Sequence, residues 1–131
     1  IQGGMFLMWG YEGEDLSDIE ATVRHVRQTQ PDTFLTTVAY PIGGTPYFED
    51  VADRVLAPAS WAQSSDRDIR IAGRRSRRFY ANADQLLKAE VELEKLSRSG
   101  LPAGPFQLAE IHRRIEMARE GMRTTFAETE A

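Results

Sequence analysis

The sequence predicts an α/β fold whose second half is mainly helical. Residues 5–9 form a continuous apolar run between glycines, and residues 33–40 are rich in β-branched and aromatic side chains. Both patterns are typical of strands. Between them lies a segment with apolar residues at helical spacing. A strand, a helix and a second strand in this order favour a βαβ unit with parallel strands and a right-handed crossover.

The first strand, residues 5–9, contains no polar residue, which is typical of a strand buried on both faces. Two strands make a very small sheet, because three or more are normally needed for independent stability. We therefore expect them to belong to a larger parallel sheet. The chain also begins with Ile1 rather than methionine, which fits a piece of a longer protein.

The first helix is expected to begin at Ser17, which has capping-box spacing to Glu20. Pro31 ends this helix, since proline cannot continue the backbone hydrogen bonding. The apolar stripe of the helix consists of Ile19, Val23 and Val26.

A second, short helix follows the second strand. Thr45 can cap it with Pro46 at its first position. We expect this helix to place Tyr47, Val51 and Val55 on one side and to end near residue 58. Residues 58–73 show no clear period, and Trp61 is their one large apolar residue.

Two long helices are predicted at the end of the chain, over about residues 75–97 and from about residue 105. Gly100 ends the first of them. In the second, Glu110 and Arg114 have the spacing of a favourable surface ion pair. The predicted organisation is therefore an α/β part over residues 1–57, an irregular connector over 58–73 and a helical extension over 74–131.

Composition excludes several classes of protein. The 131 residues are 41% hydrophobic and 27% charged, as in ordinary globular domains. The net charge of −4 gives no general attraction for nucleic acid, and no apolar run is long enough to span a bilayer. No signal peptide is visible, so a cytoplasmic location is the default expectation. Without cysteine, these residues cannot form a disulfide, a thiolate zinc site or a cysteine-ligated cluster.

Glycine-containing turns follow both predicted strands, at residues 10–14 and 40–47. The carboxyl ends of parallel strands lie at one edge of a sheet, where ligands bind in α/β folds. The alternative is that both are ordinary connections, the second with a good helix cap. Neither contains a phosphate-loop lysine or a Gly-x-Gly-x-x-Gly pattern, so nucleotide-binding motifs are not indicated.

An arginine-rich stretch near the start of the first long helix could bind substrate carboxylates, which arginine pairs with bidentately. The alternatives are phosphate contacts or the start of a solvated or docking helix. His25 and His112 are expected to be surface or half-buried residues, and no nucleophile-and-base pair or metal-binding set can be recognised. The arginines are Arg67, Arg70, Arg74, Arg75, Arg77 and Arg78.

Three motifs taken together resemble the last third of the radical S-adenosylmethionine (SAM) barrel. They are the strand and turn of residues 5–14, Gln-Pro-Asp at 30–32 and Pro-x-x-Gly-Thr-Pro-Tyr at 41–47. In that family the fifth strand ends in a Gly-x-x-Gly-Glu-like turn and the sixth in a Pro-x-x-Gly-Thr-Pro-like loop. The run Asp-Arg-Asp-x-x-x-x-Gly-Arg-x-Ser-Arg-Arg-Phe-Tyr at 66–80 resembles the cobalamin-binding branch, which includes the anaerobic magnesium-protoporphyrin IX monomethyl ester cyclase. The resemblance covers about residues 1–98.

The resemblance implies a fold, a partial (β/α)6 barrel of which this chain is the C-terminal portion. It implies that the parent protein is a radical SAM oxidoreductase or transferase, in which three cysteines hold a [4Fe-4S] cluster. SAM is cleaved there to a 5'-deoxyadenosyl radical that abstracts hydrogen from a small-molecule substrate. The branch suggests a cobalamin-dependent cyclase or methyltransferase. This chain lacks the cluster cysteines, so on its own we expect it to be inactive and to hold none of these cofactors.

The resemblance also implies site residues. The stricter family pattern for the fifth strand is Gly-x-Ile-x-Gly-x-x-Glu, and this chain departs from it with Phe6, Met8, Gly10 and Gly13 at the matching positions. The expected substrate-binding residues are Arg74 and Arg77. The expected contacts to the adenosyl part of SAM are Met8, Gly10, Val38, Ala39 and Tyr40.

The expected partners are the remainder of the parent barrel and its N-terminal domain, with no nucleic acid. A cut barrel exposes an interface, so self-association of this chain is a further expectation. The alternative function is a non-catalytic helical interaction module that docks on another domain or subunit through its two long helices.

Overall fold

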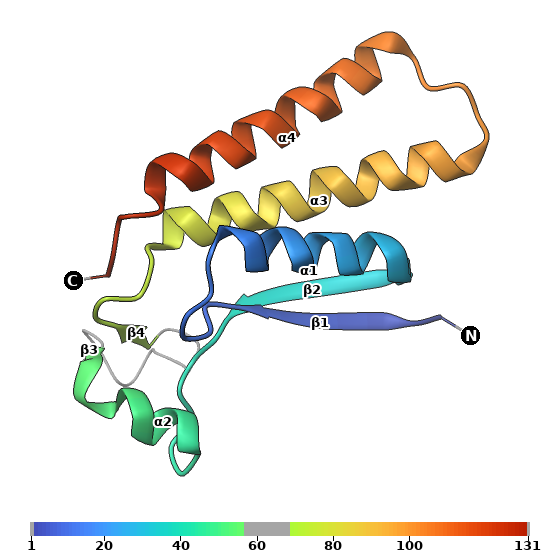
Figure 1. Ribbon diagram of the computed structural model, residues 1–131. Coiled ribbons are helices and arrows are strands. Elements are labelled where there is room, and N and C mark those ends of the chain that lie inside the picture. Colours follow the sequence, from blue (N-terminus) through green and yellow to red (C-terminus); the bar gives the residue numbers. More distant parts are fainter. Residues whose placement is uncertain (1, 57–68, 131) are drawn as a thin grey trace.

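The computed structural model describes residues 2–56 and 69–130, and it shows an α/β arrangement (Figure 1). The first part of the chain contains β1 (Gly4–Trp9), α1 (Leu16–Thr29) and β2 (Thr33–Val38). Two short segments, α2 (Pro46–Val51) and the 3-10 helix η1 (Ala52–Arg54), lead into β3 (Val55–Leu56). After the undescribed residues come β4 (Arg70–Ile71), α3 (Arg77–Ser99) and α4 (Pro105–Thr125). No helix in the described ranges is both long and apolar enough to cross a membrane.

The predicted βαβ unit is confirmed. β1 and β2 pair in parallel, with a register that runs from Gly4 opposite Thr33 to Trp9 opposite Val38. The backbone N–H of Ala39 donates to the carbonyl of Trp9 at 2.6 Å, which extends the pairing beyond β2. The two strands therefore end side by side, at one carboxyl edge.

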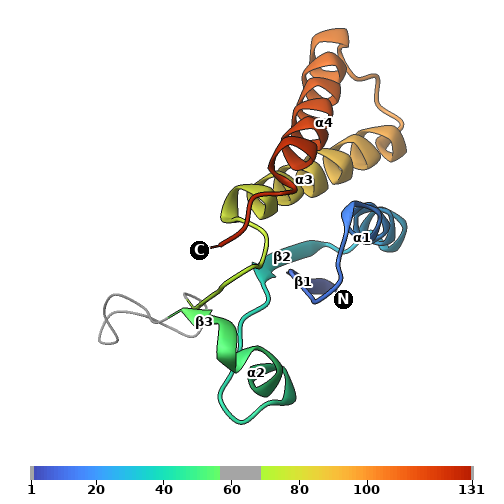
Figure 2. The ribbon, with the colours of Figure 1, turned by 60° about the vertical axis from the view of Figure 1, so that its left-hand side comes forward.

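The helices form layers on one side of this sheet. α1 lies against the strands, α3 packs along α1, and α4 packs along α3 (Figures 1 and 2). One hydrophobic core runs through the layers, so the helical extension and the βαβ unit are packed together. The buried members of this core include Trp9, Ile19, Val23, Val26, Phe79, Leu86, Leu87, Ile111 and Ile115.

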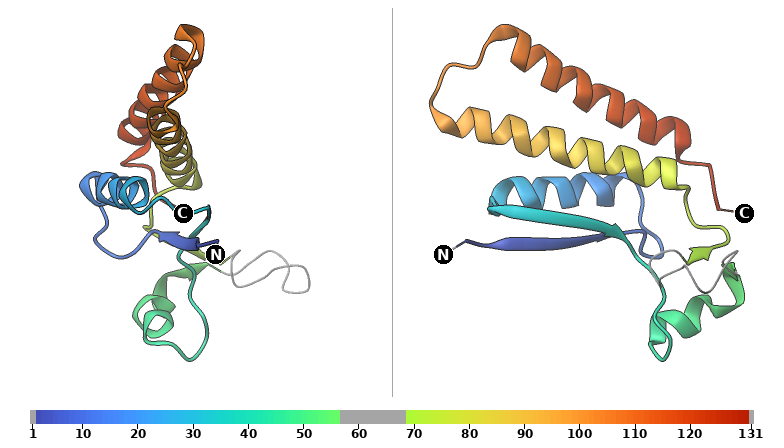
Figure 3. Two further views of the ribbon diagram at one scale, coloured as in Figure 1. Left: turned by 90° about the vertical axis from the view of Figure 1, so that its right-hand side faces the viewer. Right: turned by 180° about the vertical axis from the view of Figure 1, so that it is seen from behind.

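The opposite face of the sheet is open, which corrects the expectation that β1 is buried on both faces. Phe6 is 57% exposed and Leu35, its register partner on β2, is 70% exposed. Met5 and Leu7 alternate with Phe6 along the strand and pack against the core. The described helices cover one face only, and α2 lies beyond the carboxyl ends of the strands (Figures 1 and 3).

The N-cap of α1 lies two residues earlier than predicted. This N-cap is Asp15, not Ser17: Asp15 accepts the N–H of Asp18 at 3.0 Å, and the Asp18 carboxylate accepts the N–H of Asp15 at 2.9 Å. Ser17 instead donates its hydroxyl to Asp15. A carboxylate makes stronger hydrogen bonds to backbone N–H groups than a hydroxyl does, so the acidic residue takes the cap.

The second helix is shorter than predicted. Thr45 caps α2 through the N–H of Phe48 at 3.2 Å, as expected, but the helix ends at Val51. Val55 belongs to β3, which pairs antiparallel with β4, because β-branched Val55 finds Ile71 as a partner from a distant part of the chain. Trp61 lies outside the described residues.

Both long helices are present, with α3 capped by Ser76 and ended by Gly100 at a positive φ of 69°. The predicted pair of Glu110 with Arg114 is wrong. Glu110 pairs with Arg113 at 2.6 Å, and Arg114 reaches Glu92 on α3 at 2.5 Å. Packing of α4 on α3 turns Arg114 toward α3, where a carboxylate of the neighbouring helix is closer than one on its own helix.

Candidate functional site

The turns after β1 and β2 meet a third segment, the start of α3, at the carboxyl edge. Gly10 has a positive φ of 90°, and a Cβ atom there would lie 3.1 Å from the hydroxyl oxygen of Tyr80 and 3.2 Å from Val38. Only glycine fits this position without a shift of its neighbours. The carbonyl of Ala39 accepts a hydrogen bond from the guanidinium of Arg74. Residues from three parts of the sequence therefore form one site.

The first hollow at this edge, here called the rim cavity, has a volume of about 190 Å³. In it the carboxylate of Glu14 accepts the N–H of Gly10 at 2.8 Å. Burial raises the pKa of the Glu14 carboxyl, partly offset by this hydrogen bond. Arg54 forms an ion pair with Glu12 at the same cavity. The rim cavity is lined by Gly10, Tyr11, Glu12, Gly13, Glu14, Arg54, Gly73, Arg74, Arg75 and Tyr80.

The second hollow, here called the edge cavity, has a volume of about 290 Å³ and lies between the end of β2 and the start of α3. It shares Arg74 and Tyr80 with the rim cavity, so these two side chains separate the cavities. The edge cavity is lined by Thr37, Val38, Ile69, Arg74, Arg77, Tyr80, Ala81, Asp84 and Glu130.

Arg74 is held from two sides. Beyond its bond to Ala39, its guanidinium pairs with Glu130 at 3.3 Å, and Glu130 also accepts the N–H of Ile71 at 3.0 Å. The side chains of Arg74 and Glu130 are only 11% and 5% exposed. The expected substrate arginine is therefore already paired within the chain.

Tyr80 is the most enclosed polar residue between the two cavities, at 5% exposure. Burial raises the pKa of its phenol to about 12, so the group is neutral at physiological pH. Its ring packs edge-on against Phe79, with centroids 5.3 Å apart. Among the residues that the structure describes, its hydroxyl has no hydrogen-bond partner.

Asp84 ties α3 to both strands. Its Oδ1 accepts the indole N–H of Trp9 at 2.7 Å and the hydroxyl of Thr36 at 2.6 Å. Sequence reasoning missed both Asp84 and Tyr80. The signal that could have found Asp84 is a carboxylate four residues after Tyr80 and next to Ala83, on the apolar side of an amphipathic helix.

The residues expected to contact SAM are distributed along this edge. Gly10 lies in the rim cavity and Val38 in the edge cavity. Ala39 is buried and Tyr40 is half-buried. Met8 is half-buried on the open face of the sheet, where its sulfur accepts the hydroxyl of Tyr11 at 3.4 Å. Of the expected substrate residues, Arg77 is exposed and lines the edge cavity with Arg74.

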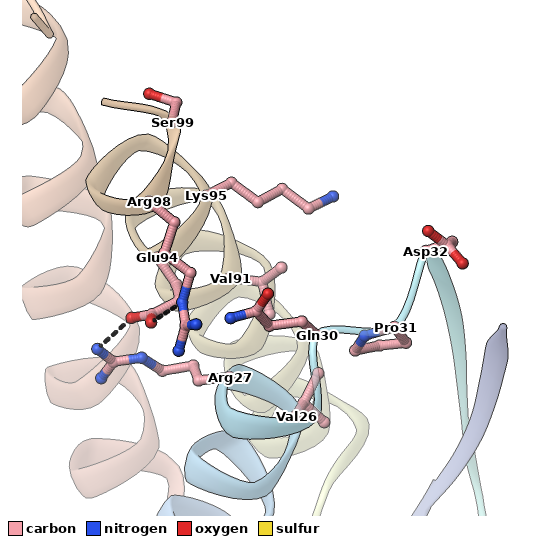
Figure 4. A pocket seen from close by; sticks show the side chains of 10 residues that line it. All are labelled: Val26, Arg27, Gln30, Pro31, Asp32, Val91, Glu94, Lys95, Arg98 and Ser99. Carbon is pink, nitrogen blue, oxygen red and sulfur yellow. Dashed lines mark hydrogen bonds and ion pairs between the residues drawn. The ribbon is translucent and has the colours of Figure 1, made fainter. Parts of the chain in front are cut away.

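A larger cavity of about 350 Å³ lies at the other end of the strands (Figure 4). Its charges are largely paired: Arg27 contacts Glu90 at 3.1 Å and Glu94 at 2.9 Å, and Arg98 contacts Glu94 at 2.6 Å. The two pairs of Arg27 join α1 to α3, and the pair of Arg98 with Glu94 lies within α3. We assign this cavity a structural role, because it lies at the amino ends of the strands and its arginines already have partners.

Within the described ranges, no group of three or more histidines and carboxylates is placed to hold a metal ion. The edge offers hydrogen-bonding and charged groups of both signs around two small hollows, which suits a small polar ligand. No family model, curated protein or solved structure matches this chain.

Proposed function

We propose that this chain is the C-terminal part of a cytoplasmic radical SAM enzyme, with β1 and β2 as the last strands of a partial (β/α)6 barrel. One observation carries the proposal: two parallel strands in register bring the turns at residues 10–14 and 40–47 to one carboxyl edge, while the helices of the described ranges cover only one face of the strands (Figure 2). A barrel strand has this asymmetry, with helices outside and side chains or ligand inside.

The open face then corresponds to the barrel interior. Phe6, Met8 and Leu35 point to this face, and Met8 is nearest to the carboxyl edge on β1. A thioether packs favourably against flat aromatic rings, so Met8 is the residue we propose to contact the adenine of SAM. Gly10 and the segment from Val38 to Tyr40 would form the rest of the surface that contacts the adenosyl group.

A [4Fe-4S] cluster does not fit this chain, which has no cysteine. The cluster and the metal anchor of SAM would belong to another part of the protein. The cobalamin-dependent cyclase or methyltransferase activity is proposed from the run at residues 66–80, of which residues 66–68 lie outside the described ranges. The residues of this chain would bind and orient the adenosyl group and the substrate.

The test uses the full-length protein that contains this chain, reconstituted with iron and sulfide under anaerobic conditions. With SAM and a reductant, we expect 5'-deoxyadenosine to form. Met8→Ala should raise the KM for SAM about tenfold, since it removes most of one apolar contact. Met117→Ala, on the exposed side of α4, is the matched control and should leave KM unchanged. A protein with a complete cluster that forms no 5'-deoxyadenosine would refute the proposal.

The isolated chain gives a second, simpler test. Because the metal anchor is missing, calorimetry should show weak or undetectable SAM binding by these residues alone. Tight binding would contradict the proposal that the main anchor of SAM lies in another part of the protein.

A second candidate function, docking on another domain or subunit, is favoured by the tip of the α3–α4 hairpin. Leu101 is 74% and Phe106 90% exposed there, beside an open apolar hollow of about 540 Å³. Large exposed apolar side chains that gather around a hollow are typical of interaction surfaces. Phe106→Ser should abolish binding to the remainder of the parent protein in a pull-down, while unchanged binding would argue against this role. The hollow is lined by Leu93, Leu96, Ser97, Gly100, Leu101, Pro102, Ala103 and Leu108.

A further inference from the structure

The edge cavity contains two opposite charges that do not pair with each other. Asp84 and Arg77 both line it, on the same helix. Among the described residues, neither takes part in an ion pair. The other two charges of the cavity, Arg74 and Glu130, neutralise each other. Among the described residues that line the cavity, cations and anions are therefore equal in number, and one of each is outside any ion pair.

Asp84 has one carboxylate oxygen available to a ligand. The residue is half-buried, and its Oδ1 takes both hydrogen bonds from Trp9 and Thr36. Both donors are neutral, and Oδ2 has no hydrogen-bond partner among the described residues. A half-buried carboxylate at a cavity can form a charge-assisted hydrogen bond with the ammonium group of a ligand, which is stronger than a bond between neutral groups.

The separation of the two residues indicates why they do not pair. Residues seven apart are two helical turns apart, about 10.5 Å along the axis. They therefore lie on the same side of α3, with Tyr80 and Ala81 between them in the sequence. A molecule that lies along this side of the helix could contact both charges at once.

We propose that the edge cavity binds a small zwitterion, with its ammonium group at Asp84 and its carboxylate at Arg77. A ligand with both charges pairs both residues and leaves the cavity neutral, whereas an anion or a cation alone would leave one of them unpaired. The spacing favours an amino acid whose two charged groups are separated by several bonds. The volume of about 290 Å³ limits the ligand to a small molecule.

The site lies within this chain, so the inference goes beyond the proposed radical chemistry and does not depend on it. Trp9 provides a reporter, because its indole N–H donates to the same carboxylate that would bind the ammonium. The probes are 4-aminobutanoate and 6-aminohexanoate, with butylamine and butanoate as singly charged controls. Binding is followed by the indole N–H resonances of ¹⁵N-labelled protein. The chain has two tryptophans, so the resonance that remains in a Trp61→Phe variant belongs to Trp9.

We expect a saturable shift of the Trp9 indole resonance with at least one zwitterion, and binding at least about tenfold weaker for each singly charged control. Asp84→Asn keeps an oxygen that can accept from Trp9 and Thr36 but removes the charge, so it should weaken binding about tenfold or more. Arg77→Gln, an exposed change that should not affect folding, should do the same. Arg78→Gln is the matched control, because Arg78 pairs with Glu128 and does not line the cavity.

Three results would overturn the inference. The first is the absence of any saturable shift with either zwitterion up to about 10 mM, beyond the dissociation constant of a weak site. The second is binding of butylamine or butanoate that is as tight as binding of the zwitterions. The third is binding that neither Asp84→Asn nor Arg77→Gln weakens. No step of this test involves SAM or a cluster, so its outcome is separate from that of the radical proposal.

Discussion

At the carboxyl edge, Arg74 differs from Arg77 and Arg78 in having its guanidinium inside the protein. It holds the end of β2 through the carbonyl of Ala39 and the C-terminal segment through Glu130. The backbone around it is joined to the same segment, since the N–H of Glu130 donates to the carbonyl of Arg74 at 2.7 Å. Arg74 therefore connects three distant parts of the sequence.

Replacement of Arg74 by methionine should destabilise the protein strongly. The change leaves the carboxylate of Glu130 buried without a cation, which costs about 3 kcal/mol or more in the free energy of unfolding. Urea denaturation measures the loss. Arg78→Met is the control: Arg78 is largely exposed, and its loss should cost less than about 1 kcal/mol. An equal, small effect of both variants would show that the Arg74–Glu130 pair is not important for stability.

Glu14 should make stability depend on pH in an unusual direction. Burial raises the pKa of its carboxyl in the folded state. The contribution of Glu14 to stability is therefore fully present below its ordinary pKa of 4.5 and is lost as the pH rises through the higher folded-state value. Glu14→Gln, which can still accept from the N–H of Gly10, should be more stable than the original protein at pH 7.

Urea midpoints measured between about pH 4 and pH 7 test this sign. The advantage of Glu14→Gln should shrink toward pH 4 and stay below about 1 kcal/mol at pH 7, because solvent screens a half-exposed group. Glu49→Gln, at an exposed position on α2, is the control and should show no such trend. A Glu14→Gln protein that is less stable at pH 7 would show that the charged form is favoured by the fold.

At the scale of elements, α3 and α4 approach closely where Gly121 faces Asn82. A Cβ atom at Gly121 would lie 2.2 Å from the side-chain oxygen of Asn82 and 2.5 Å from its Cγ. The Asn82 amide donates to the carbonyl of Arg78 at 2.9 Å. Glycine inside a helix is otherwise unfavourable, so its presence here is explained by the contact with α3.

A double-mutant cycle separates these two effects. Gly121→Ala alone should destabilise the protein by about 1 kcal/mol, because Asn82 must move and lose its hydrogen bond. In an Asn82→Ala background the same change should stabilise by about 0.5–1 kcal/mol, since only the better helix propensity of alanine remains. Thermal and urea unfolding of the four proteins measure the coupling. The same sign in both backgrounds would mean that the close contact does not decide the effect.

At the scale of the whole molecule, a chain of ion pairs joins the three helical layers. Arg119 on α4 contacts Glu20 on α1 at 2.7 Å and Glu90 on α3 at 3.0 Å, and Glu90 also pairs with Arg27 on α1. Glu90 is buried, and its charge is matched by two arginines. These contacts hold the helices together on one side of the sheet, while the other face of the sheet remains open.

The open face should cause self-association of the isolated chain. Leu35 and Phe6 lie opposite each other on it, and β1 and β2 pair only with each other among the described strands. We expect the weight-average mass in sedimentation equilibrium to rise with concentration, and Leu35→Glu to suppress the rise. Because Leu35 is exposed, this change should alter stability by less than about 0.5 kcal/mol.

Leu101→Glu, at the hairpin tip, is the matched control for Leu35→Glu. Suppression by Leu101→Glu alone would assign the contact to the hairpin instead of the sheet. A monomer at all concentrations would contradict self-association through either surface.

The sequence predicted the elements that depend on local patterns. Runs of β-branched residues and the spacing of apolar residues are properties of neighbouring residues. They predicted the strands around Trp9 and Val38, the helix between these strands and the two long helices. The cap at Asp15 was missed because two candidate caps lie two residues apart. β3 was missed because a strand of two residues depends on a partner that is distant in the sequence.

The sequence by itself determined that this chain is a βαβ unit with a helical extension, and that both glycine turns lie at one edge. Only the tertiary structure decided that Arg74 is paired with Glu130, that Asp84 and Tyr80 join this edge, and that one face of the sheet is uncovered. The physical reason is that local propensity fixes the backbone of each segment, whereas the partner of a charge and the cover of a face depend on how distant segments pack.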